Sequence, residues 1–306
     1  MKRVYVLVLS FCLLCASVFS KEIEIPFTCE KDGRISVLFS DEQFNYLFFL
    51  DTASTDNVLF NNGYAKLSEK LGIDIKESLI EFLTQNNPDK SKAEINAYAE
   101  EYIKTAGIQF NIGDLKYKDF AVPEVIFVYR PEENSKIDFS KYDGIINLDF
   151  FGDINNILID YKDKKIKINS TEKLKHALAY EKFNQLNLYL VEVSLNGVKQ
   201  QALIDTGASC LFLRDNYKDS SRITEEKLLN SLQQAKADSH AESKIKVKLQ
   251  IGRWEEKITG IYPDINNYNL TDNAGKVLQN INLLGYDVFK NHKIQIDFDK
   301  KEFRIE

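Results

Sequence analysis

The clearest pattern in the chain is an alternation of apolar and polar residues that predicts β-hairpins. The segment "LYLVEVSLNGVKQQALID" alternates on both sides of Asn196-Gly197, a dipeptide that strongly favours a tight hairpin turn. The segment "ISVLFSDEQFNYLFFLD" has the same layout around a polar turn at Ser40 to Gln43. The segments "ILIDYKDKKIKI" and "IQIDFDKKEFRI" each predict a strand, a charged turn and a second strand. These hairpins predict a mostly β fold.

Three segments between the hairpins have helical patterns instead. The first, "YAKLSEKLGIDIKESLIEFL", carries apolar residues at helix-like spacing. The second, "SKAEINAYAEEYIKTAG", begins with a capping box of Ser91 and Glu94 and stops at Gly107. The third, "TEEKLLNSLQQAKA", starts with Thr224 as an N-cap. We expect these segments to be helical insertions into a β framework.

The chain also repeats itself. "FFLDTASTDNVLF" in the first half corresponds to "ALIDTGASCLFL" in the second, and "DGIINLDFFGDINNILIDYKDKKIKI", from Asp143, corresponds to "INLLGYDVFKNHKIQIDFDKKEFRI", from Ile281. Two correspondences in the same order indicate two related halves. We expect a first lobe over residues 21–169, a linker over 170–184 and a second lobe over 185–306.

The N-terminus is typical of an export signal. A basic start is followed by the apolar run Val4–Cys15 and by small residues, which predicts a signal peptide over residues 1–20, cut after Ser20. The mature protein is therefore expected outside the cytoplasm, in the periplasm or the extracellular space. The run is short for a membrane span and no later segment resembles one, so no stable span is expected. A lipid anchor on Cys15 is the alternative, which Leu14 disfavours because such sites want a small residue there.

Composition and charge limit the classes of function that the chain can have. The chain has 306 residues, of which 44% are hydrophobic, so it can form a sizeable core. Loss of the signal peptide would change the formal net charge from −6 to −8, which disfavours a nucleic-acid partner. Cys29 and Cys210 would remain, and we expect two unbridged thiols although export makes a disulfide chemically possible.

The segment "LIDTGASCLFL" places a carboxylate at the end of an apolar strand. Such a carboxylate is costly unless it is solvated, paired or functional. Thr206 after Asp205 supplies a hydroxyl, Gly207 permits a tight turn with close backbone approach, and Ala208 and Ser209 keep the turn small. Alone, this motif would be an ordinary turn between strands.

The second copy of the motif, with Asp51, changes this interpretation. Two related halves can pack about a pseudo-two-fold axis, which brings equivalent turns together. Two carboxylates at such an axis cannot both ionise easily, so they share a proton at moderately acidic pH. Such a pair can activate a water with one carboxylate and protonate a carbonyl oxygen with the other. Asp51 and Asp205 are thus the predicted catalytic pair for peptide hydrolysis, which needs no cofactor.

These motifs resemble those of aspartic proteases of the pepsin/retropepsin type. "LIDTGAS" matches the catalytic signature of that family, and "NLLGYDVF" resembles its later apolar-apolar-Gly segment, here Leu283, Leu284 and Gly285. "IQIDFDKKEFRI" is similar to the final hairpin of bacterial retropepsin-like domains. The resemblance covers roughly residues 24–169 and 185–306. It implies a mostly β, bilobal, pepsin-like arrangement of two retropepsin-like halves with helical insertions.

The resemblance also implies roles for individual residues. Asp51 and Asp205 would be the catalytic dyad, with Thr52 and Thr206 locking the two loops together. The residues expected to support the catalytic loops are Thr52, Ala53, Thr206, Gly207, Ala208, Ser209, Leu284 and Gly285. A hairpin flap would cover a peptide or protein substrate, and "VKLQIGRWEEKITGIY" and "IQFNIGDLKYKDFAV", both built around Ile-Gly, are the candidates. The expected state is a monomer; the alternative is a homodimer in which Asp205 meets its copy.

The first half departs from the family pattern. Ala53 replaces the glycine of its motif, and Asn147 replaces the glycine of its companion segment. The first half is therefore either a tolerated variant or a decayed copy, which would make the protein an inactive peptide-binding or envelope scaffold. His176, His240 and His292 are scattered, so the sequence predicts no protein metal site.

Overall fold

The computed structural model describes most of the predicted mature chain. The described residues are 21–31, 33–105, 107–123, 125–129, 139–183, 187–214, 243–262 and 281–306. The predicted signal peptide, the lipid-anchor alternative at Cys15, the helix expected to begin at Thr224 and His240 lie outside these residues.

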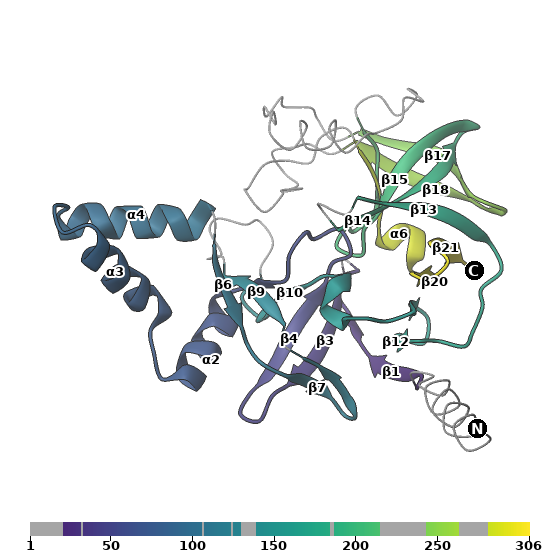
Figure 1. The fold of residues 1–306 in the computed structure, drawn as a ribbon. Coiled ribbons are helices and arrows are strands. Elements are labelled where there is room, and N and C mark those ends of the chain that lie inside the picture. The colour runs from purple at the N-terminus through teal and green to yellow at the C-terminus, as the bar shows by residue number, and fades with distance from the viewer. Residues whose placement is uncertain are drawn as a thin grey trace, which may run out of the picture.

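The first half is built mainly from strands (Figure 1). They are β1 (Ile23–Pro26), β2 (Thr28–Cys29), β3 (Ile35–Ser40), β4 (Asn45–Leu50), β5 (Val58–Leu59), β6 (Ile108–Asn111), β7 (Leu115–Tyr117), β8 (Phe120–Val122), β9 (Ile126–Tyr129), β10 (Gly144–Ile146), β11 (Asn156–Asp160) and β12 (Lys165–Ile168). One sheet has the order β6-β9-β5-β10-β4-β3-β7-β8, with β2 paired to β3. A short 3-10 helix, η1 (Leu148–Phe151), follows β10.

The second half is also built mainly from strands. They are β13 (Ala177–Phe183), β14 (Leu188–Leu195), β15 (Val198–Ile204), β16 (Leu211–Phe212), β17 (Ser243–Ile251), β18 (Trp254–Tyr262), β19 (Asn282–Leu284), β20 (Lys293–Asp297) and β21 (Glu302–Ile305). A pairing between β14 and β17 closes the set β14-β15-β19-β16-β18-β17 on itself. The short helix α6 (Tyr286–Phe289) follows β19 as η1 follows β10.

The two halves arrange their central strands in the same order. The order β3-β4-β10-β5-β9 in the first half matches β14-β15-β19-β16-β18 in the second. The directions match as well: β4–β10 and β15–β19 are parallel, β10–β5 and β19–β16 are antiparallel, and β5–β9 and β16–β18 are parallel. The prediction of a mostly β, bilobal fold is thereby confirmed.

Strands from both halves also pair with one another in the order β1-β12-β11-β20-β21-β13. At the centre, β11 and β20 are antiparallel, with Ile157 opposite Ile296. The structure differs here from the predicted linker over 170–184, because β13 lies within that segment and pairs with β21 and β14. Ala177–Phe183 is therefore part of the sheet, where β13 lies between β21 and β14.

Three helices are inserted between β5 and β6 and project from the sheets (Figure 1). They are α2 (Asn61–Leu71), α3 (Ile75–Asn86) and α4 (Lys92–Thr105). The first predicted helical segment is divided, because Gly72 ends α2 in the left-handed region (φ 65) and Asp74 caps α3 by accepting from the amide of Glu77. The predicted capping box of α4 is confirmed: the Ser91 amide donates to Glu94 at 2.8 Å, and the Glu94 amide donates to the Ser91 hydroxyl at 3.4 Å.

Two ion pairs attach α2 to the first sheet. The Lys66 ammonium lies 2.7 Å from the carboxylate of Asp143, and the Lys70 ammonium lies 2.9 Å from that of Asp41. The carboxylate side chains are only 3% and 2% exposed, so each needs its partner to offset the cost of burial. Between the two lysines, Leu67 is buried against the core.

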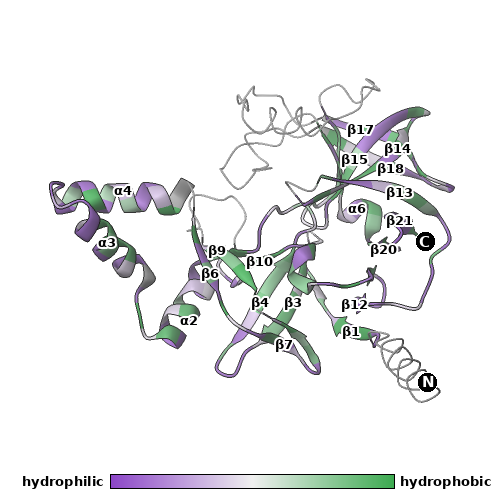
Figure 2. Ribbon diagram, viewed as in Figure 1, coloured by the Kyte–Doolittle hydropathy of each residue, from purple (hydrophilic) through white to green (hydrophobic). Residues whose placement is uncertain are grey.

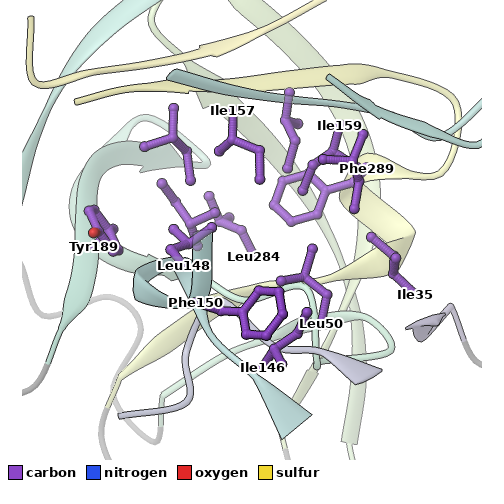
Figure 3. Close-up of a cluster of buried hydrophobic side chains, with 14 of the residues drawn as sticks. Ile35, Leu50, Ile146, Leu148, Phe150, Ile157, Ile159, Tyr189, Leu284 and Phe289 are labelled. Carbon is purple, nitrogen blue, oxygen red and sulfur yellow. The ribbon is translucent and has the colours of Figure 1, made fainter. Parts of the chain in front are cut away.

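The core lies where the two halves meet, and Figure 3 shows side chains of both within one cluster. Leu50 and Ile146 come from the first half, and Leu284 and Phe289 come from the second; all four are fully buried. Burying an aliphatic or aromatic side chain of this size contributes roughly 1.5–3 kcal/mol. Figure 2 shows hydrophobic residues concentrated along the core strands, whereas α3 and α4 mix both kinds. Because Leu50 precedes Asp51 directly, this core supports the loop that carries Asp51.

The predicted turns at Asn196-Gly197 and at Ser40 to Gln43 and the predicted unbridged thiols agree with the structure. Asn196 (φ 51) and Gly197 (φ 87) form the two-residue turn between β14 and β15, and Asp41 caps the β3–β4 turn by accepting from two backbone amides. Cys29 and Cys210 form no disulfide, as expected. Within the described part of the chain, no helix has the length and apolar character that crossing a bilayer requires.

Candidate active site

Each candidate aspartate follows the end of a buried strand. Asp51 follows β4, and its amide donates to the carbonyl of Ile146 at 2.9 Å. Asp205 follows β15, and its amide donates to the carbonyl of Leu284 at 3.0 Å. In both halves the neighbouring parallel strand, β10 or β19, therefore holds the start of the loop.

The two loops are joined by the hydroxyl groups of Thr52 and Thr206. The Thr206 hydroxyl donates to the carbonyl of Leu50 at 2.9 Å and accepts from the Thr52 amide at 3.1 Å. The Thr52 hydroxyl donates to the carbonyl of Ile204 at 2.6 Å and accepts from the Thr206 amide at 3.1 Å. Both threonines are 1% exposed. These four buried hydrogen bonds fix the relative positions of the two aspartates.

Backbone amides orient both carboxylates. The Ala53 amide donates to Asp51 Oδ1 at 2.8 Å, and the Gly207 amide donates to Asp205 Oδ1 at the same distance. The Ala208 amide adds a further hydrogen bond to Asp205 Oδ1 at 3.0 Å. Ala53 is not among the residues with positive φ, so alanine fits this turn without backbone strain. The departure from glycine at position 53 thus leaves the orientation of Asp51 intact.

Asp51 and Asp205 lie side by side. Each carboxyl group affects the pKa of the other, and a β-carbon at Gly207, two residues after Asp205, would come within 2.6 Å of Asp51 Oδ2. Asp205 is 5% exposed, whereas Asp51 is partly exposed. The structure therefore brings the predicted pair together within one chain, and it explains why glycine stands at position 207.

The electrostatics of the pair favour a bound proton. Burial and then the neighbouring charge of Asp51 raise the pKa of Asp205 well above its ordinary value. Burial also raises the pKa of Asp51, although hydrogen bonds from the Ala53 amide, the Asp205 carboxyl and the Ser54 amide act in the opposite direction. The two groups titrate as a pair that keeps one proton to a higher pH than isolated aspartates would.

Position 285 in the companion segment has no room for a side chain. A β-carbon there would lie 2.4 Å from the carbonyl oxygen of Cys210 and 2.5 Å from that of Ala208. The next residue, Tyr286, donates its amide hydrogen to the carbonyl of Ala208 at 2.8 Å. The backbone at the junction of β19 and α6 thus packs directly on the loop that carries Asp205.

In the first half, side chains make the contact at the position equivalent to Gly285. Asn147 is buried and caps η1, where its side chain accepts from the Asp149 amide at 3.0 Å. Its own amide donates to the side-chain oxygen of Asn57 at 2.9 Å. Sequence reasoning singled out Asn147 but missed Asn57. The signal that could have revealed Asn57 is that it replaces the apolar Leu211 of the second copy.

The remaining predicted support residues lie in or beside the loops. Ala208 packs in an apolar cluster with Cys210 and Leu283, and Ala53 packs against that cluster. Ser209 is half-buried, and its supporting role stays a prediction.

Of the two candidate flap segments, one forms the predicted hairpin and the other does not. The segment 243–262 does form a hairpin, β17–β18, and its Trp254 packs edge-on against His292 at 5.1 Å between ring centroids. The segment 108–122 is not a hairpin about Ile112-Gly113, because β6 pairs with β9 and the turn lies at Lys118-Asp119, between β7 and β8. Ile-Gly was a poor turn signal here, since Gly113 only separates two consecutive strands. The flap stays unassigned.

The described residues contain no group of three or more His, Cys, Asp or Glu side chains placed to hold a metal ion. In comparisons with known proteins, no family model matches the chain, and no curated protein matches it significantly. The chemistry of the site is therefore inferred from the paired aspartates and their surroundings.

Proposed function

We propose that this protein is an aspartic-type endopeptidase of the pepsin/retropepsin type, in which Asp51 and Asp205 hydrolyse peptide bonds. One observation carries the proposal: the carboxyl groups of two equivalent loops lie side by side in a largely buried setting, where four threonine hydrogen bonds hold the loops together. Such an arrangement would be destabilising for a merely structural pair of acids, because no cationic side chain of the described residues lowers the pKa of either carboxyl.

The reaction follows from one proton shared by the pair. The ionised carboxylate removes a proton from a water molecule as the water oxygen attacks the carbonyl carbon of the substrate. The protonated carboxyl gives its proton to the carbonyl oxygen, and a tetrahedral gem-diol forms. The carboxyl that took the water proton then gives it to the amide nitrogen, the other carboxylate takes a proton from a gem-diol hydroxyl, and the C–N bond breaks to give a carboxylic acid and an amine. The pair again holds one proton at the end.

The threonine hydrogen bonds support this mechanism by positioning the reacting groups. Catalysis of this kind depends on holding two carboxyl groups at a fixed separation, and small displacements are costly. The hydroxyls of Thr52 and Thr206 connect each loop to the carbonyl that precedes the opposite aspartate. The substrate class is a peptide or protein, and the dyad within one chain favours a monomer over the homodimer alternative.

We also propose that the protein acts outside the cytoplasm. The basic start and apolar run of residues 1–20 support export, and a dyad that must retain a proton suits a mildly acidic compartment.

The direct test is cleavage of a defined peptide library by chain 21–306, read by mass spectrometry from acidic to neutral pH. We expect cleavage with an acidic optimum, because ionisation of the second carboxyl removes the proton that the mechanism needs. Asp205→Asn is the matched control and should produce no cleavage. A wild-type protein that cleaves no peptide at any pH would overturn the proposal in favour of an inactive peptide-binding relative.

A further inference from the structure

The first half replaces a leucine and a glycine of the second half by two asparagines. Four strand pairings fix the correspondence between the halves: Leu50 with Ile146 and Ile204 with Leu284 in the parallel pairs, and Ile145 with Val58 and Leu283 with Phe212 in the antiparallel pairs. By this register, Asn57 is the counterpart of Leu211, and Asn147 is the counterpart of Gly285. These two asparagines are hydrogen-bonded to each other: the Asn147 amide donates to the side-chain oxygen of Asn57 at 2.9 Å.

The backbone is nearly the same at the two companion positions. Asn147 has φ −99 and ψ −172, and Gly285 has φ −108 and ψ −165. Because any residue can adopt these angles, the second half needs glycine for space alone, beside the carbonyl of Cys210. In the first half the buried Asn147 side chain fits at the equivalent place, and the side chain of Asn57 reaches its backbone amide. A side-chain contact has thus replaced a close backbone contact.

Asn57 is itself held on both sides. Its carbonyl accepts from the Val128 amide at 2.8 Å, and its side-chain nitrogen donates to the carbonyl of Ile126 at 3.4 Å. Its side-chain oxygen holds Asn147, which follows directly after Ile146, the acceptor of the Asp51 amide. Asn57 therefore links β9 to the end of β10, on which the position of Asp51 depends.

We propose that Asn57 and Asn147 are positioning residues that hold Asp51 in register with Asp205, so that the first half is a working half and not a decayed copy. The inference rests on the proposed function, since it assigns a role within the same site. It also means that glycine at position 147 is not an improvement: Asn147→Gly keeps the backbone amide that donates to Asn57 but removes the buried side chain that accepts from the Asp149 amide and caps η1.

The test compares four variants: Asn57→Leu, Asn147→Gly, the double variant Asn57→Leu/Asn147→Gly, and Asn86→Leu as a control at the exposed end of α3. We expect each single variant at the site to lower kcat on the order of 100-fold with little change in KM, because a displaced aspartate affects the chemical step more than binding. The acidic pH profile should shift as well. The double variant reproduces the residue pair of the second half and should regain part of the lost kcat, while the control should match the wild type.

Three results would overturn the inference. They are an Asn57→Leu variant with wild-type kcat and pH profile, an Asn147→Gly variant with raised kcat, and a double variant no better than either single one. Thermal unfolding of each variant separates loss of fold from loss of positioning, because a merely structural role would lower the melting temperature and leave the pH profile of the folded protein unchanged.

A measurement without substrate separates this inference from the proposed function. Carbon-13 NMR of labelled aspartate carboxyls follows the titration of the pair directly. If the wild type cleaves no peptide but shows a coupled titration that Asn57→Leu abolishes, the proposed function fails and the positioning role stands. If Asn57→Leu leaves the titration unchanged, the positioning role fails.

Discussion

Replacement of Thr206 by valine tests the connection between the two loops. Valine keeps the shape of the side chain but can neither donate to the Leu50 carbonyl nor accept from the Thr52 amide. Both partners lie in a region where Leu50 is fully buried and Thr52 is 1% exposed, so water cannot easily replace the lost hydroxyl.

The structure sets the size of the effect. A buried donor or acceptor left without its partner costs about 1–3 kcal/mol, and this substitution leaves one of each. We therefore expect Thr206→Val to lower the free energy of unfolding by about 2–6 kcal/mol. Thr206→Ser is the matched control: it keeps the hydroxyl and loses one methyl group, which costs about 1 kcal/mol.

Urea-induced unfolding, followed by circular dichroism, measures both variants. The double variant Thr52→Val/Thr206→Val should lose less than the sum of the two single variants, because the first substitution already loosens the contact that the second would break. Equal free energies of unfolding for Thr206→Val and Thr206→Ser would refute the reasoning, since they would show that the hydroxyl contributes nothing to the joining of the loops.

Three further predictions concern other parts of the chain. Gly285→Ala should lower the free energy of unfolding by about 1–3 kcal/mol and reduce activity, because its β-carbon would meet the Cys210 carbonyl at 2.4 Å; chemical denaturation and peptide cleavage measure both effects. Burial acts to raise the pKa of Asp41, but hydrogen bonds from Lys70 and two backbone amides outweigh it and hold the pKa below its ordinary value. Asp41→Asn should thus be less stable than the wild type at neutral pH, and the difference should vanish as acid protonates the wild-type carboxylate; urea titrations at several pH values decide this. N-terminal sequencing of protein from the native cells should begin near Lys21, and an intact Met1 on cytoplasmic protein would contradict export.

Local patterns were sufficient to predict the hairpin turn at Asn196-Gly197 and, together with the repeated motif, the meeting of the two aspartates. The turn at Asn196-Gly197 needs positive φ at both positions, and few other dipeptides provide it, so the sequence is specific there. Asp51 and Asp205 were predicted to meet because equivalent turns approach each other at a pseudo-two-fold axis. Both inferences use short segments in which the residue type and the backbone geometry are closely coupled.

Features that depend on pairing between distant strands could not be predicted in the same way. The strand β13 was placed in the linker because Ala, Glu and Lys interrupt its Leu, Tyr and Phe, so that no clear pattern marks it; its pairing with β21 and β14 decides its structure. The bond between Asn57 and Asn147 joins residues far apart in sequence, so it appears only once the register of β5 and β10 is known. The position of the hairpin turn at Lys118-Asp119 likewise depends on the pairing of β6 with β9.

The most direct test of the account measures peptide cleavage by Asp51→Asn, Asp205→Asn and the double variant at the pH optimum of the wild type. Two carboxyl groups that share one proton act as a unit, so removal of either should cost as much as removal of both. We predict near-total and equal loss of kcat in all three variants, each still folded by circular dichroism. Full activity of Asp51→Asn together with an inactive Asp205→Asn would contradict the account and would favour a pair formed between two chains.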